Sequence, residues 1–490
     1  MKPGATNTNK PSALVLGDGL IAFVKRECPT CELVAPVLAD IAASNNLIVF
    51  SQDDPTFPET ISSVRDDSQL ESSFHLDVEI VPTLIRISNG KEVDRTLGWN
   101  RDEWQHMTGI DNLGSGLPIN QPGCGSLSTG PGIAEELMIR FGKTNFVARS
   151  IPLPEYDDDV EACYERGWSD GLPVTPPTPV RVMRMLAGTT RDPQEIIGLV
   201  PPKLAPCTVE KIAINAVMAG CRPEYLPVVL AAIEAALIDD FAMHGVLCTT
   251  SFAGPMVIVN GPVCQAIGLN SGMNVLGQGT RANSTIGRAL QLIIRNIGGG
   301  IPGEIDRAMH GNPAKVGLCF AENEEQSCWE SLSVERGFAP AVSTVSLWAG
   351  EGTQGVSDDL SRDPESLCRS WAASLMTIGH IRRTGRNDVL IVVSPENQRV
   401  FCDAGWDKTK LRERLFTLTT RQGRDIISGL DGMAPGIPPG RGAEMIPKFR
   451  AEGIHFVHAG GPAGMVSTII PSWSATGIRG TNLVTVPIKN

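Results

Sequence analysis

Two cysteines separated by two residues stand near the start of the chain, in the segment Cys28-Pro29-Thr30-Cys31. If this segment opens a helix, the first thiol meets free N–H groups and the positive end of the helix dipole, which together stabilise a thiolate. The alternative for a CxxC pair is half of a zinc site, but the chain contains no second CxxC. The spacing therefore predicts a redox-active disulfide, with Cys28 as the nucleophile and Cys31 as the resolving thiol.

The elements that must position this pair follow an α/β order. Apolar runs of strand length alternate with one helix-length stretch whose apolar residues recur on one face, and Asn89-Gly90 is typical of a hairpin turn. The expected strands cover residues 13–24, 47–51, 81–87 and 93–97, and the expected helix covers residues 33–44. This pattern predicts a small α/β domain over residues 1–108.

The same region resembles thioredoxin in several separate places. After the second cysteine come Ala35-Pro36-Val37-Leu38 and Ile41-Ala42, and further on come Ile80-Val81-Pro82-Thr83, Asn89-Gly90-Lys91 and Gly98. The resemblance covers about residues 13–107. It implies a thioredoxin fold, a kink in the active-site helix at Pro36, and a cis Pro82 that faces the CxxC pair and shapes the substrate groove.

Three positions depart from the thioredoxin pattern. Ala22 stands where thioredoxins carry a buried acid that relays protons, and Glu27 replaces the tryptophan before the nucleophile. Carboxylates at Glu27 and Glu32 flank the cysteines and should disfavour a thiolate. We therefore expect a donor that is more specialised than a general disulfide reductase.

A glycine- and proline-rich segment, 109–154, is predicted to be a linker that contains a helix over residues 133–141. Within it lies Gly123-Cys124-Gly125-Ser126. Cys124 could be a third thiol on a flexible loop and an exchange partner for Cys28. The alternative is an incidental cysteine in an ordinary linker.

The remainder is expected to be a larger mixed α/β region of one or two domains, 155–380 and 381–490, without an internal sequence repeat. The segments Glu165–Pro173 and Ala321–Glu325 resemble an uncharacterised bacterial family associated with UGSC-motif proteins, some of them fused to thioredoxin domains. This resemblance spans roughly residues 155–490 and implies no established reaction.

Two glycine-rich loops in the larger region are candidate substrate-binding sites. The first precedes an apolar helix and contains Arg281, Asn283 and Ser284, which could form an anion pocket at the start of that helix. The alternative is a helix that is merely capped by Asn283 or Ser284 and begins near Thr285. The second loop, at Gly460 and Gly461, follows a predicted strand over residues 454–458 and would let a ligand approach backbone N–H groups.

Acidic residues after a short apolar strand provide a further candidate site. Glu322, Glu324 and Glu325 could bind a divalent metal or supply an acid or base, with Cys319, His244 and His310 as further metal candidates. The alternative is a solvated acidic loop. His455 and His458 would face opposite sides of their strand, which argues against a shared zinc ion.

Composition limits the partners. The net charge of −12 argues against nucleic acid and anionic membranes. The polar N-terminus has no apolar segment of the secretory type, and no run reaches the roughly 20 apolar residues of a membrane helix. We expect a cytoplasmic protein whose 12 cysteines are mostly reduced.

These observations predict a thiol-dependent oxidoreductase in which the CxxC pair supplies electrons, or handles sulfur, for chemistry on a small anionic substrate in the larger region. An external disulfide reductant and self-association into a homo-oligomer are expected as partners. One alternative is a binding or adaptor protein whose thioredoxin domain acts on a protein partner. Another is a metalloenzyme that forms or cleaves carbon–sulfur bonds.

Overall fold

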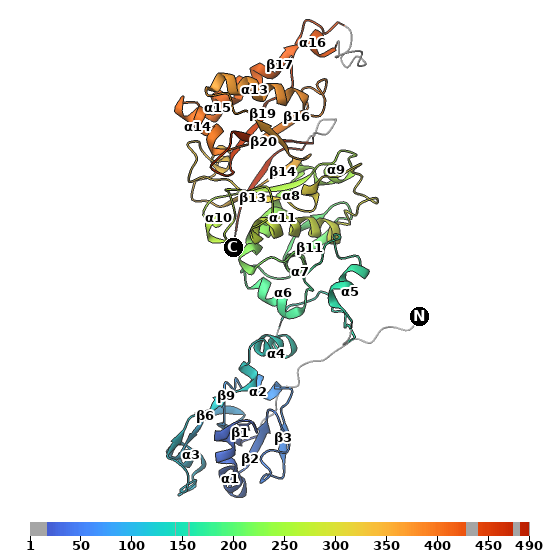
Figure 1. Ribbon diagram of the computed structural model, residues 1–490. Coiled ribbons are helices and arrows are strands. Elements are labelled where there is room, and N and C mark those ends of the chain that lie inside the picture. Colours follow the sequence, from blue (N-terminus) through green and yellow to red (C-terminus); the bar gives the residue numbers. More distant parts are fainter. Residues whose placement is uncertain (1–16, 143, 155–156, 428–439, 474–480, 490) are drawn as a thin grey trace, which may run out of the picture. The chain divides into compact units, whose positions relative to one another are not determined.

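The computed structural model describes residues 17–142, 144–154, 157–427, 440–473 and 481–489. The chain divides into two compact units, Met1–Asn145 and Phe146–Asn490 (Figure 1). Within the described ranges, no helix is long and apolar enough to cross a lipid bilayer.

The first unit is built on a five-stranded sheet in the order β3-β2-β1-β5-β6. Its central strand β1 runs parallel to β2 and antiparallel to β5. The strands are β1 (Gly19–Val24), β2 (Leu47–Ser51), β3 (Val64–Asp66), β5 (Thr83–Ser88) and β6 (Lys91–Leu97). The predicted α/β class is confirmed, although residues 13–16 of the first predicted strand lie outside the described residues.

The helix α1 (Pro29–Ser44) begins directly after Cys28, which is its N-cap. Pro29 occupies the first helical position, where its missing N–H costs no hydrogen bond, and Pro36 lies inside the helix. Apolar side chains at Val34, Val37, Leu38 and Ile41 are buried in the core of the unit. The burial of this face fixes the helix on the sheet, and the helix start thereby fixes the two cysteines.

Much of the segment predicted to be a linker belongs to the first unit. The short strand β8 (Asn120–Gln121) pairs with β7 (Trp99–Asn100), and β9 (Cys124–Gly125) pairs with β4 (Ile80–Val81). These short pairings form two two-stranded sheets of their own, in which backbone groups of the segment find partners in the first unit. Helix α4 (Ile133–Phe141) follows, with the Phe141 ring 6.1 Å from that of Phe74.

The second unit contains two four-stranded mixed sheets, in the orders β13-β12-β14-β21 and β15-β20-β16-β19. The strands of the first sheet are β12 (Gly254–Asn260), β13 (Cys319–Ala321), β14 (Thr344–Gly350) and β21 (Val484–Pro487). Those of the second are β15 (Gln354–Ser357), β16 (Asn387–Val393), β19 (Phe449–His458) and β20 (Val466–Pro471). The chain passes from the first sheet to the second between β14 and β15, because β15 pairs with β20, and it returns to the first sheet at β21.

The two sheets repeat one topology that the sequence did not reveal. In the first sheet β12 and β13 are parallel and β14 is antiparallel to β12, while in the second β16 and β19 are parallel and β20 is antiparallel to β16. Helices connect each parallel pair, namely α10 (Val263–Ala266) and α11 (Arg281–Ile293) in the first, and α14 (Pro395–Asp403) and α15 (Lys408–Thr419) in the second.

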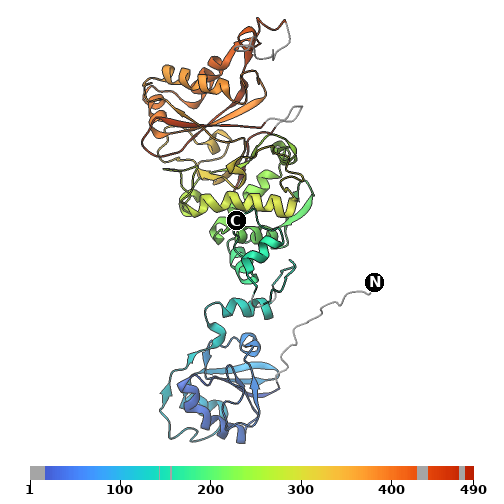
Figure 2. The same ribbon diagram turned by 45° about the vertical axis from the view of Figure 1, so that its right-hand side comes forward.

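Apolar helices cover the sheets. Helix α8 (Leu226–Ala236) is buried along almost its whole length and shares a core with α7 (Val209–Ala219) and α11. Figure 2 shows α11 from the side as the long yellow-green helix. Helix α13 (Pro364–Thr377) shares a core with α15 and the second sheet. The glycine- and proline-rich stretch 432–442 lies mostly outside the described residues.

Candidate functional site

The first unit places Cys28 at the junction of α1 and the loop before β5. Its Sγ accepts a hydrogen bond from the backbone N–H of Cys31 at 3.4 Å, and it lies 3.5 Å from the carbonyl oxygen of Val81. The Val81–Pro82 peptide bond is cis, as the thioredoxin resemblance implies. Both cysteines are buried. The geometry brings Cys28, Cys31 and Pro82 together.

Cys124 lies at the same place. Its Sγ is 2.9 Å from the Sγ of Cys28. The pairing of β9 with β4 sets Cys124 opposite Val81, and Lys25 Nζ donates to the Gly125 carbonyl oxygen at 2.8 Å. The predicted proximity of Cys124 and Cys28 is present in the structure, but on a paired strand and not on a free loop.

Further contacts hold the segment around β9 in place. Thr30 Oγ1 donates to the carbonyl oxygen of Pro122 at 2.7 Å. A Cβ added to Gly123 would lie 2.7 Å from the Val81 oxygen, whereas one added to Gly125 would meet nothing within 4 Å. Gly123 therefore lets the segment approach the β4 backbone closely. Sequence reasoning missed these positioning residues, although the glycines on both sides of Cys124 were the available signal.

The electrostatics favour a thiolate at Cys28. The pKa of Cys28 is lowered to about 5, and the largest cause is a hydrogen bond from the Cys31 thiol. The Cys124 thiol and the N–H groups of Cys31 and Thr30 lower this pKa further, while burial opposes the shift. Burial is the main cause that raises the pKa of Cys31, and it also raises that of Cys124. The expectation that flanking carboxylates would disfavour the thiolate is corrected, because Glu27 and Glu32 are exposed and hydrogen bonds dominate.

The candidate anion pocket in the second unit has a different geometry from the one predicted. Helix α11 begins at Arg281, so Asn283 and Ser284 lie inside its first turn and do not cap it. Arg281 Nε donates to the Gly220 carbonyl oxygen at 2.8 Å, and Asn283 bonds the backbone of Asn270. These side chains hold loops together and do not converge on an open anion site.

The second glycine loop is also engaged with the protein. The N–H of Gly460 donates to the Ser271 carbonyl oxygen at 2.9 Å, and its φ of 120° favours glycine. A Cβ on Gly461 would lie 3.4 Å from Met273. The loop therefore packs on the segment before α11.

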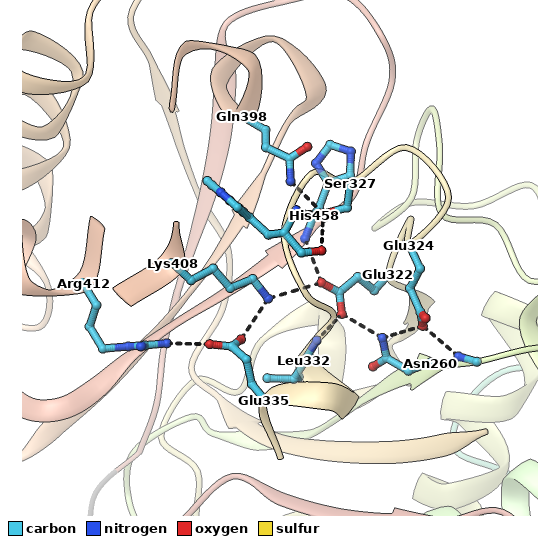
Figure 3. Close-up of polar contacts among 12 residues, drawn as sticks. Asn260, Glu322, Glu324, Ser327, Leu332, Glu335, Gln398, Lys408, Arg412 and His458 are labelled. Atoms are coloured by element: carbon cyan, nitrogen blue, oxygen red, sulfur yellow. Dashed lines mark hydrogen bonds and ion pairs between the residues drawn. The ribbon is translucent and has the colours of Figure 1, made fainter. Parts of the chain in front are cut away.

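The acidic cluster is dominated by Glu322, whose side chain is fully buried (Figure 3). One carboxylate oxygen accepts from Asn260 Nδ2 and from the Leu332 N–H, both at 2.7 Å. The other lies 3.6 Å from Lys408 Nζ and accepts from the His458 N–H at 3.4 Å. Burial raises the pKa of Glu322, while Lys408 and the hydrogen bonds oppose this shift.

The other acids and metal candidates do not join this cluster as ligands. Glu324 accepts from Asn260 Nδ2 and from the Gly261 N–H, both at 2.7 Å, and Glu325 is exposed. Cys319 is buried in β13, whereas His244 and His310 are exposed. In the part of the chain that the structure describes, no group of three or more His, Cys, Asp or Glu residues is arranged to hold a metal ion.

The cluster lies where the carboxyl ends of both parallel strand pairs meet. The Asn323 N–H donates to the His458 carbonyl oxygen at 2.7 Å, which joins the end of β13 to the end of β19. Lys408 also binds Glu335 at 2.8 Å, and Arg412 binds the same carboxylate at 2.9 Å. Sequence reasoning missed Lys408 because no spacing links it to Glu322.

Comparison with known proteins supports the reading of the first unit. The chain is 33% identical over 86 residues to thioredoxin H-type 1 of Nicotiana tabacum, which is 18% of this chain and 60% of that protein. The chain thus spans less than two thirds of the length of that relative. No family model matches the chain, so the resemblance of the second unit to UGSC-associated proteins stays a prediction. The first unit is thioredoxin-like in its sheet, in its cysteine pair and in its sequence.

Proposed function

We propose that the first unit catalyses thiol–disulfide exchange through three cysteines. Cys28 is the attacking thiolate, Cys31 is the resolving thiol, and Cys124 is a second intrachain partner for Cys28. The observation that carries the proposal is the 2.9 Å distance between the sulfur atoms of Cys28 and Cys124, together with the lowered pKa of Cys28.

The reaction begins with attack of the Cys28 thiolate on one sulfur of a client disulfide. A mixed disulfide forms, and the other client sulfur leaves as a thiolate that takes up a proton. Cys31 then loses its proton and attacks Cys28, which frees the client as a dithiol and leaves a Cys28–Cys31 disulfide. Two electrons have passed to the client, and an external dithiol reductant returns them to the pair.

Cys124 can carry out the same resolving step. Its thiol loses a proton and attacks Cys28 in the mixed disulfide with the client, so that a Cys28–Cys124 bond forms and the client sulfur leaves as a thiolate that takes up a proton. An extended segment that pairs with an exposed strand is a common way to bind a peptide. Because β9 pairs with β4 in this way, the chain's own Cys124 occupies the position of a client sulfur.

The test is oxidation of the full chain carrying Cys31→Ser, followed by acid quenching, alkylation and peptide mapping. We expect a Cys28–Cys124 disulfide in this variant and none when Cys124→Ser is added. Cys31→Ser with Cys264→Ser is the matched control and should still form the bond, because Cys264 belongs to the second unit. A Cys28 that stays reduced, or that pairs with scattered cysteines, would contradict the proposal.

The proposal concerns the first unit. Delivery of electrons to a small anionic substrate in the second unit stays a prediction from the sequence. Arg281 is bonded to main-chain carbonyl oxygens, and Arg288 is paired with Asp170 at 2.7 Å.

A further inference from the structure

A disulfide in the second unit joins two segments that are distant in the sequence. Cys328 follows β13, Cys402 lies near the end of α14, and 74 positions separate them. The other ten cysteines of the chain are free thiols. Among the described residues, Cys328 and Cys402 are thus the one pair of cysteines joined by a disulfide.

The disulfide fastens residues 323–331, here called the clamp loop, to helix α14. Inside the clamp loop, Ser327 Oγ accepts from Gln398 Nε2 at 2.8 Å, and Trp329 Nε1 donates to the Trp406 carbonyl oxygen at 2.8 Å. The Asn323 N–H donates to the His458 carbonyl oxygen at 2.7 Å. Figure 3 shows the Gln398–Ser327 contact beside His458.

The imidazole beside the clamp loop is enclosed without a well-formed hydrogen bond. His458 is fully buried, and among the described residues neither of its ring nitrogens has a partner at normal hydrogen-bond geometry. The backbone of Val393 is its polar neighbour and partly offsets the lowering of the His458 pKa by burial. The Oδ1 atoms of Asn260, at the end of β12, and of Asn397, in the first turn of α14, are buried and unpartnered in the same way. Buried polar groups are nearly always satisfied, since each unpaired one is costly.

We infer that Cys328 and Cys402 form a reversible redox modification site, and that their disulfide keeps the clamp loop closed over His458. Reduction releases the clamp loop from α14 and lets water or a polar ligand reach the imidazole. The unpartnered atoms of His458, Asn260 and Asn397 then gain the hydrogen bonds that they lack in the closed state. The device thus controls access to the carboxyl ends of both parallel strand pairs.

The chemistry needs a dithiol as the reductant. Cys328 is exposed and Cys402 is partly buried, so the thiolate of the dithiol attacks the Cys328 sulfur. A mixed disulfide forms, and Cys402 leaves as a thiolate that takes up a proton. The second thiol of the dithiol then displaces Cys328, which also takes up a proton, and two electrons have passed from the dithiol to the protein.

Reduced Cys28 and Cys31 represent the same chemical class of reductant, but the inference does not rest on their activity. The test therefore supplies dithiothreitol as the dithiol. The full chain is treated with or without dithiothreitol, alkylated with iodoacetamide and desalted. It is then exposed to diethyl pyrocarbonate, and the modified histidines are located by peptide mass spectrometry.

We expect His458 to be protected in the oxidised chain and to be modified about tenfold faster or more after reduction, as expected when a locally closed segment opens. The exposed His310 and His380 serve as internal references and should react equally in both samples. Amide hydrogen exchange in residues 323–329 should rise with the modification of His458.

Two variants keep the test decisive. Cys328→Ser with Cys402→Ser should react rapidly at His458 with and without dithiothreitol, while Cys368→Ser, a free cysteine in the same core, should behave like the native chain. The inference is overturned if Cys328 and Cys402 are free thiols in the oxidised protein. It is equally overturned if their reduction leaves both His458 and the clamp loop protected.

Discussion

The Sγ atoms of Cys28 and Cys124 lie 2.9 Å apart, although 96 positions separate the two residues in the sequence. The contact depends on a short antiparallel pairing in which Val81, next to the cis Pro82, lies opposite Cys124. In the proposed function, the strand that carries Cys124 takes the position of a bound peptide, and Cys124 is the third cysteine of the centre.

Alkylation of reduced Cys28 should depend on pH in a way that reports its thiolate. Because hydrogen bonds from Cys31 and Cys124 help to lower the pKa of Cys28 to about 5, the rate with iodoacetamide should reach half its maximum near that pH and fall below it. Cys124→Ala removes one donor and should move the midpoint upward. Cys264→Ala should leave it unchanged, and a native midpoint near the ordinary thiol value of about 8.5 would contradict the assignment.

Gly123 and Gly125 offer a matched pair of substitutions on either side of Cys124. In Gly123→Ala the new Cβ would lie 2.5 Å from Ile80 Cγ2 and 2.7 Å from the Val81 oxygen, so β9 must lift from β4 at a cost of about 1–3 kcal/mol. Formation of the Cys28–Cys124 disulfide in a Cys31→Ser background should slow about tenfold or more, as followed by quenched alkylation. In Gly125→Ala the new Cβ would meet nothing within 4 Å, so the Cys28–Cys124 disulfide should form at the original rate. Equal slowing in both variants would refute this account.

Lys408 compensates the buried charge of Glu322. Removal of one partner of a buried ion pair typically costs about 3–5 kcal/mol, and we expect a loss of this size in the free energy of unfolding for Lys408→Met. Burial raises the pKa of Glu322, so the folded state binds its proton more tightly and the loss should shrink as the pH falls. Urea unfolding followed by tryptophan fluorescence at about pH 5 and about pH 8 checks the sign.

The control for this experiment lies on the same helix. Lys410 is exposed, and its Nζ lies 4.6 Å from the centre of the Trp406 ring. Lys410→Met should therefore cost no more than about 1 kcal/mol at either pH. A Lys408→Met loss that is equally small, or that grows at low pH, would show that Glu322 is not held as a buried anion.

Lys448 should make the stability of the second unit depend on alkaline pH. Its Nζ donates to the carbonyl oxygens of Ile378 and His380 at 2.7 and 2.6 Å, and burial, with Arg383 adding to it, lowers its pKa to about 8. The folded state thus loses the proton before the unfolded state does. The free energy of unfolding should rise by up to about 3 kcal/mol as the pH increases from about 8 to about 10.5.

This rise should disappear in Lys448→Met and persist in Lys203→Met, since Lys203 is exposed. Chemical denaturation at a series of pH values measures it directly. A native profile that is flat or falling over this interval would contradict the sign of the shift.

The spacing of apolar residues along the sequence predicted those helices and strands that bury one apolar face in a core. Helix α4 and strand β2 have the predicted bounds, because spacing at the helical or strand period records which side of an element faces a core. The short strands β8 and β9 gave no such signal. Hydrogen bonds between backbone groups hold them to strands elsewhere in the chain. Because such pairing does not depend on side chains, it produces no periodic spacing of apolar residues in the sequence.

The sequence by itself was sufficient to identify Cys28-Pro29-Thr30-Cys31 as the candidate redox pair, since the residue types, their spacing and the helix that follows are all local. Only the tertiary structure decided that Cys124 is the nearest third thiol, that Cys328 pairs with Cys402, and that Glu322 faces Lys408. It also corrected the expected effect of Glu27 and Glu32 on the thiolate. The physical reason is that hydrogen bonds, burial and disulfides act over distances in space, and the distances along the chain do not reveal them.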